Sequence, residues 1–228
     1  MLLLAIVAVA GFLLVRMQMG HVRRVADERR SILDSVRGVL EDSELAQRGI
    51  DYPVLTGTYR GAPVTVAVIA DTLALRQLPT LWLSVTRRQP LPLAGPVDIL
   101  LRPSSTDIVS PGERFPVQHP VPPDWPQHIR VATPLGGTPN LGGLSAALPL
   151  LHDPRTKDLL VTPTGARLVT RLARAELGQY RIVKRAKFVV NLTAGELTAL
   201  LDDVCAMTAG IERAATDPHG VPTAGGGA

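Results

Sequence analysis

The chain has 228 residues, 46% of them hydrophobic and 19% charged, with a formal net charge of +4. This apolar fraction excludes a chain that is disordered throughout, and the small net charge gives no support to nucleic-acid binding. The single cysteine, Cys205, excludes an intramolecular disulfide framework and agrees with a reducing compartment.

Residues 1–15 are uniformly apolar, and a basic flank follows at Arg16, Arg23 and Arg24. In a helix, the stretch to residue 19 covers about 28 Å, close to the bilayer core of about 30 Å. We therefore expect residues 1–19 to be a transmembrane anchor in the lipid bilayer. A cleaved signal peptide would need a basic start, and a buried soluble helix is seldom apolar on all sides.

The orientation of this anchor follows from its flanks. Lys and Arg lie only on the C-terminal side, so the positive-inside rule predicts an N-terminus outside and a cytoplasmic domain. The expected protein is therefore single-pass in the inner (cytoplasmic) membrane.

A juxtamembrane helix is expected over residues 20–48, because apolar residues recur there at three- and four-residue steps. Fewer than four clean heptads are present. We therefore expect this helix to pack on its own domain instead of forming a dimerising coiled coil.

Four strands are expected next. Two β-branched runs, 53–59 and 63–69, flank a short Gly-containing link and predict a hairpin. Residues 81–86 and 97–101 predict a third and a fourth strand. Trp82 lies between two leucines in the third, and we expect it to be largely buried.

Residues 103–143 are rich in proline and glycine and predict a long irregular insertion, which often carries function. One extended segment in it suits a partner's groove, or else wraps this protein's own sheet with its tryptophan filling a gap. Its residues are Phe115, Pro120, Pro122, Pro123 and Trp125. A hydrolytic or metal site assembled around His119 and His128, within 106–128, is an alternative use of the insertion.

The C-terminal part is expected to be ordered. Residues 158–162 and 166–173 predict a hairpin, although 166–177 also has a helical pattern, and 179–189 predicts a further strand. Thr193 and Glu196 form a capping box that begins a helix reaching about residue 215. Residues 216–228 are expected to be a flexible tail.

Seven basic residues against one acid give a local charge of 7 − 1 = +6 between residues 167 and 187. This face suits anionic head groups or an acidic protein partner, whereas RNA would need more interleaved aromatics. Its members are Arg167, Arg171, Arg174, Arg181, Lys184, Arg185 and Lys187.

Catalytic motifs are absent from the sequence. The glycine-rich loop 136–143 lacks the ending of a phosphate loop, and neither a serine elbow nor an HExxH pattern occurs. Cys205 follows Asp202 and Asp203, the opposite of the positive setting that activates a thiol. No catalytic residue, metal site or cofactor is predicted.

Several segments together resemble an uncharacterised family of bacterial single-span membrane proteins with no known activity. They are residues 57–64 (GTYRGAPV), 78–86 (LPTLWLSVT), 125–126 (WP) and 157–169 (KDLLVTPTGARLV). The resemblance covers most of the part after the anchor and implies no functional residue.

The expected fold class is α+β: a transmembrane helix, then a mostly antiparallel sheet with flanking helices in a domain over 49–215. The favoured function is a non-enzymatic accessory or scaffold subunit of a larger membrane protein assembly, with a protein partner in the membrane or at its cytoplasmic face. The alternatives are a membrane-tethered hydrolase and a lipid- or small-ligand-binding domain with a pocket between the sheet and the last helix.

Overall fold

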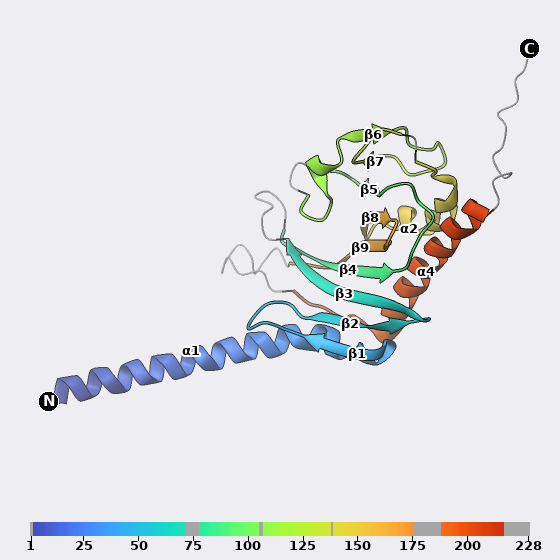
Figure 1. Ribbon diagram of the computed structural model, residues 1–228. Coiled ribbons are helices and arrows are strands. Elements are labelled where there is room, and N and C mark those ends of the chain that lie inside the picture. The colour runs from blue at the N-terminus through green and yellow to red at the C-terminus, as the bar shows by residue number, and fades with distance from the viewer. Residues whose placement is uncertain (1, 72–77, 105–106, 138, 176–187, 217–228) are drawn as a thin grey trace, which may run out of the picture.

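The computed structural model describes residues 2–71, 78–104, 107–137, 139–175 and 188–216. Nine strands form one antiparallel sheet in the order β1-β2-β3-β4-β9-β8-β5-β7-β6 (Figure 1). The strands are β1 (Glu41–Ala46), β2 (Val54–Tyr59), β3 (Ala62–Asp71), β4 (Thr80–Arg88), β5 (Val97–Leu101), β6 (Val117–His119), β7 (Ile129–Thr133), β8 (Thr156–Thr162) and β9 (Gly165–Arg174).

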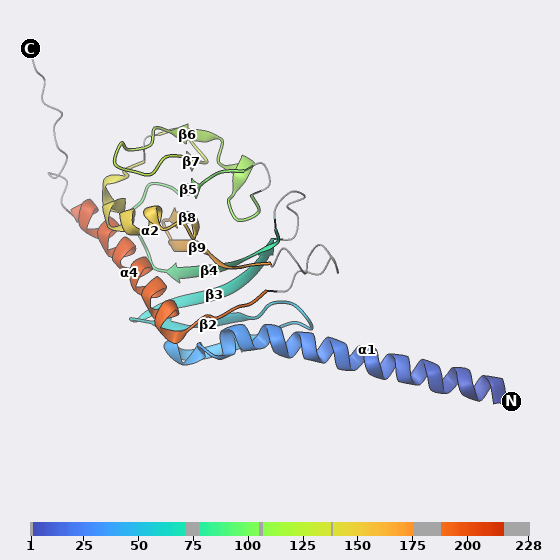
Figure 2. The same ribbon diagram turned by 180° about the vertical axis from the view of Figure 1, so that it is seen from behind.

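The helical elements lie mainly at the two ends of the described chain. They are α1 (Leu2–Asp34), the short 3-10 turns η1 (Arg37–Val39), η2 (Gly112–Arg114) and η3 (Gly142–Ala147), α2 (Leu148–His152) and α4 (Ala194–Thr216). Helix α4 packs against η3, β9, β4 and η1, and Figure 2 shows it running across the strands.

The β8–β9 hairpin lies in the middle of the sheet, between β4 and β5. Its turn is tight because Gly165 adopts φ +150°, and a Cβ there would lie 2.2 Å from the Arg87 carbonyl oxygen of β4. Only glycine therefore fits this contact between neighbouring strands.

The core follows from strand alternation. Leu81, Leu83 and Val85 of β4 are buried, as are Leu197 and Leu201 of α4. Successive strand residues point to opposite faces, so these three share the face on which the core is built.

Trp82 has the opposite parity from Leu81 and Leu83. It is only partly buried and pairs in register with Ile69 of β3 and Arg171 of β9. Trp82 therefore does not belong to the buried core, because parity along the strand places it on the other face of the sheet.

No helix in the described part of the chain is long and apolar enough to cross a membrane. The transmembrane anchor expected at residues 1–19 is therefore wrong. The fold class that included it, the single-pass topology and the inner-membrane localisation with a cytoplasmic domain are wrong with it. The apolar run of fifteen residues covers about 22 Å against about 30 Å of hydrocarbon. Helix α1 then continues through Arg16, Arg23 and Arg24 to Asp34.

Other expectations had mixed outcomes. The first hairpin, the strands at 81–86 and 97–101, and the strand at 166–173 are confirmed. The juxtamembrane helix is wrong beyond Asp34, because β1 occupies Glu41–Ala46. The insertion 103–143 contains two further strands, β6 and β7. The strand expected at 179–189 and the tail at 216–228 lie almost wholly outside the described residues.

Candidate functional site

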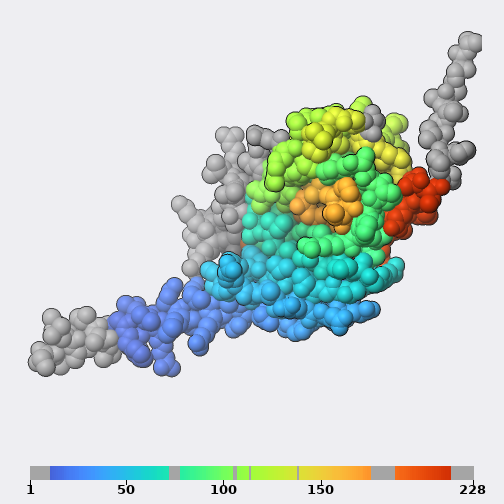
Figure 3. Space-filling model, in the orientation of Figure 1, coloured from blue at the N-terminus to red at the C-terminus, as the bar shows by residue number. Residues whose placement is uncertain are grey.

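The projecting half of α1, defined as residues 11–24, carries a large exposed apolar surface. Figure 3 shows the blue helix extending beyond the body of the sheet. Six large apolar side chains on it are each more than half exposed, between 52% and 72%. They are Phe12, Leu13, Leu14, Val15, Met17 and Met19. A contiguous exposed apolar surface marks a site of interaction rather than ordinary solvated surface.

The apolar side chains surround the helix instead of forming one stripe. Successive helical residues are about 100° apart, so Phe12, Leu13, Leu14 and Val15 point in four directions. Arg16, Arg23 and Arg24 are exposed on the same half, and within the described residues none of them forms an ion pair.

The other half of α1 is fixed to the connection between β1 and β2. Leu33 is fully buried, and the Arg29 guanidinium lies 4.6 Å from the centre of the Tyr52 ring. Gln47 Nε2 donates to the Ala26 carbonyl at 2.9 Å, and Arg29 Nη1 donates to the Ile50 carbonyl. These contacts set the direction in which the projecting half leaves the domain.

The basic face expected between residues 167 and 187 is only partly described. Arg181, Lys184, Arg185 and Lys187 lie outside the described residues. Arg167 is engaged in the interior, with Nη2 2.8 Å from Asp158 Oδ2, while Arg174 is exposed. An interaction through this face stays a prediction.

Arg171 lies close to other arginine side chains. Burial and the positive charges of Arg174, Arg102 and Arg155 lower the pKa of Arg171. Arg155 is paired with Asp153, 2.9 Å away, and this contact holds the pKa of Asp153 below its usual range despite partial burial.

The proline-rich segment lies largely against the sheet. Trp125 is buried within the core cluster, which confirms that it fills a gap in this protein's own structure. Phe115 and Pro122 are partly buried, and Pro120 and Pro123 are exposed. A partner at this segment stays a prediction.

The two histidines of the insertion are not joined into a hydrolytic cluster. His119 Nε2 lies 2.8 Å from Thr133 Oγ1, and His128 is exposed with φ 62°. Over the described ranges, no group of three or more His, Cys, Asp or Glu side chains is placed to hold a metal ion.

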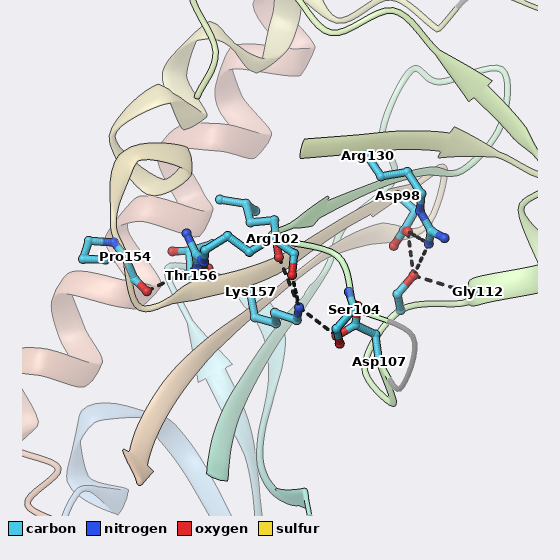
Figure 4. A network of polar contacts seen from close by, with 11 residues as sticks. Asp98, Arg102, Ser104, Asp107, Gly112, Arg130, Pro154, Thr156 and Lys157 are labelled. Carbon is cyan, nitrogen blue, oxygen red and sulfur yellow. Dashed lines mark hydrogen bonds and ion pairs between the residues drawn. The ribbon is translucent and has the colours of Figure 1, made fainter. Parts of the chain in front are cut away.

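Two buried aspartates, each paired with an arginine, lie near the loop that follows β5, and Figure 4 shows the pair of Asp98 and Arg130. Asp98 on β5 and Asp158 on β8 are both 0% exposed. Arg130 lies 3.1 Å from Asp98, and Arg167 lies 2.8 Å from Asp158. The loop contributes Ser110, whose Oγ donates to Asp98 at 2.7 Å. Burial and the neighbouring Asp98 raise the pKa of Asp158 well above its usual range.

Lys157 anchors the start of the same loop (Figure 4). Its Nζ lies 2.7 Å from Asp107 Oδ1 and donates to the carbonyls of Leu101 and Arg102 at 3.2 and 2.8 Å. Lys157 therefore ties the end of β5 to Asp107 in the loop.

A polar cleft of about 310 Å³ lies between α4, the end of β4 and the tip of the β2–β3 hairpin. Its charged lining residues are Arg60, Arg87, Asp202 and Glu212. Cys205 also lines it, and burial raises the pKa of that thiol, so it is not an activated nucleophile.

The inward orientation of Arg87 was not predicted, although the sequence contains a pattern that indicates it. Leu81, Leu83 and Val85 alternate on the core face, and Arg87 continues the same period of two. That parity directs its guanidinium inward.

No family model matches this chain, and no curated protein sequence matches it. A solved structure of the mycobacterial trehalose monomycolate transport factor A, TtfA, is similar with a TM-score of 0.40 and 12% identity. The match covers 84% of this chain and 94% of that one. A likeness at this score carries no argument about fold or function, and the family resemblance from sequence stays a prediction.

Proposed function

We propose that this chain is a non-enzymatic accessory subunit that docks onto a partner protein through the projecting half of α1. The observation that supports the proposal is the set of six apolar side chains, each more than half exposed on one helix. Burying a large apolar side chain contributes about 1.5–3 kcal/mol, so this surface supplies ample free energy for association.

The distribution of these side chains describes the partner's site. A two-stranded coiled coil would cover one stripe of the helix and leave the rest of Phe12–Val15 in water. A groove that encloses the helix from several sides, built from several helices of the partner, fits better. Carboxylates at its rim would meet Arg16, Arg23 and Arg24.

The test compares a triple variant and a double variant of the full chain. In the first, Phe12, Leu14 and Met17 are changed to Ser. In the second, a matched control, Leu135 and Val189 are changed to Ser; these are 78% and 67% exposed elsewhere on the surface. Cross-linking in the native cell, followed by co-purification, identifies the partner, and the reconstituted pair gives the Kd.

We expect the first variant to lose the partner and keep the melting temperature, because its three side chains are each more than half exposed. The control variant should keep both. Retention of the partner by the first variant would contradict the proposal. Flotation of the full chain with protein-free lipid vesicles, lost in the same variant, would also contradict it.

A further inference from the structure

The cleft beside α4 contains two opposite charges that form no direct ion pair with each other or with any other described residue. Arg60 Nη2 lies 2.8 Å from Asp202 Oδ1, so these two lining residues neutralise each other. Arg87 and Glu212 form no ion pair within the described part of the chain. The site therefore offers one free positive and one free negative charge.

Arg87 is the positive end. It is only 8% exposed, with Nε donating to Gln89 Oε1 at 2.9 Å and Nη1 donating to the Tyr59 carbonyl at 2.8 Å. The structure gives its Nη2 no hydrogen-bond partner among the described residues. A buried guanidinium without a counter-charge is costly, and a carboxylate fits its forked donors in two parallel hydrogen bonds.

Glu212 is the negative end. Its Oε1 accepts a hydrogen bond from Gln89 Nε2 at 2.6 Å. The Gln89 amide thus bridges Arg87 and Glu212 and holds both on the same wall of the cleft. Tyr59 connects this group to Asp202, because its carbonyl accepts from Arg87 and its hydroxyl donates to Asp202 Oδ1 at 2.6 Å.

We propose that this cleft binds a small zwitterion, a free amino acid or a short peptide. Its carboxylate pairs with Arg87 and its ammonium group with Glu212. The volume of about 310 Å³ is at the lower end of the range for small-molecule sites, about 300–1,000 Å³. The site is remote in sequence from the projecting half of α1 and independent of the function proposed for it.

The experiment is calorimetric titration of the full chain with the twenty free amino acids and with alanyl-alanine. The best binder is then compared with its N-acetyl form, which lacks the ammonium group, and its amide, which lacks the carboxylate. Inorganic phosphate is the plain anion. We expect saturable binding, and at least about tenfold weaker binding of both capped forms, or about 1.4 kcal/mol.

Glu212→Gln is the decisive variant, because it keeps the acceptor for Gln89 and removes only the charge. This variant should bind the zwitterion about tenfold or more weakly and should bind the N-acetyl form as tightly as wild type does. Arg213→Gln changes the exposed neighbouring residue and should alter neither affinity. Arg87→Gln should abolish binding. If that variant fails to fold, the affinities of Glu212→Gln and of the capped ligands still test the proposal.

Three results would overturn the proposal. One is no saturable binding of any probe up to about 10 mM, weaker than the range in which specific sites work. Another is binding that Glu212→Gln leaves intact. The third is phosphate binding as tightly as the best zwitterion, which would make the cleft a site for anions only.

Discussion

Asp98 and Asp158 bring two carboxyl groups together in the interior, with Arg130 and Arg167 on their outer sides. The Oδ1 atoms of both aspartates have no hydrogen-bond partner among the described residues. A carboxyl proton on Asp158 gives it a donor to offer Asp98, and this interaction adds to the rise of the pKa of Asp158. Burial then favours the neutral form of Asp158, which agrees with the raised pKa of this group.

The raised pKa of Asp158 makes stability depend on pH. Above about pH 4 the unfolded Asp158 is ionised while the folded one keeps its proton, so folding takes up a proton. This contribution is present below about pH 4 and is lost as the pH rises toward the folded pKa, by up to about 1.4 kcal/mol per pH unit.

Asp158→Asn replaces that proton with a permanent amide donor to Asp98 and keeps an acceptor for Arg167. We therefore expect the variant to gain stability relative to wild type as the pH rises from about 4 to 7, measured by urea unfolding at each pH. Asp153→Asn, at a partly exposed ion pair, is the control and should show no such gain. A constant difference between Asp158→Asn and wild type across this range would show that Asp158 is ionised in the fold.

Gly165 is the second residue with a sharp prediction. Gly165→Ala places a Cβ against the Arg87 carbonyl of β4 in a backbone conformation that side chains rarely adopt. Strain of this kind costs about 1–3 kcal/mol, so the unfolding free energy should fall by at least that amount. Gly95→Ala, where nothing lies within 4 Å of the added atom, should be nearly neutral. An equal effect of both substitutions would mean that β4 and β9 do not approach as described.

At the scale of elements, the two halves of α1 differ in burial. Leu33 is fully buried and Leu14 is 66% exposed. Leu33→Ala should therefore cost about 2–5 kcal/mol of unfolding free energy, whereas Leu14→Ala should change it by less than about 0.5 kcal/mol. Thermal unfolding of the two single variants measures the contrast. Equal losses would show that the projecting half packs on the domain.

Short sequence patterns predicted those elements that are determined by neighbouring residues in the chain. The β2–β3 hairpin follows from its link, and α4 begins at the capping box, where Glu196 N donates to Thr193 Oγ1 at 3.2 Å. The pattern failed at β1, since Glu41–Ala46 is a polar edge strand whose pairing with β2 is decided by tertiary contacts.

The sites were harder to predict than the elements. Asp98 and Asp158 lie close together because the β8–β9 hairpin lies beside β5, and strand order is not encoded in any short segment. Arg87 could have been placed on the core face by parity, but its charge argued against burial. The apolar surface of α1 was visible in the sequence, whereas its projection from the domain depends on how Leu33 is anchored.

At the scale of the whole molecule, the strand order predicts a gradient of stability. β4, β9 and β8 lie inside the sheet and are mostly buried, whereas β1 and β6 are edge strands with no fully buried residue. Hydrogen exchange followed by mass spectrometry should show the slowest amides in β4 and β9 and the fastest strand amides in β1 and β6. Exchange in β6 as slow as in β9 would contradict the sheet order or reveal a partner on that edge.

The late position of the β8–β9 hairpin in the chain has a consequence for synthesis on the ribosome. β4 pairs with β3 on one side, but its other neighbour is β9, which ends at Arg174. At about 5–20 residues per second, roughly 4–17 s pass between the translation of the two strands. During that time the apolar edge of β4 is an unpaired template for aggregation. Nascent chains that stop before β8 are therefore the species that chaperones must hold, and release becomes safe only when this hairpin has emerged to fill the centre of the sheet.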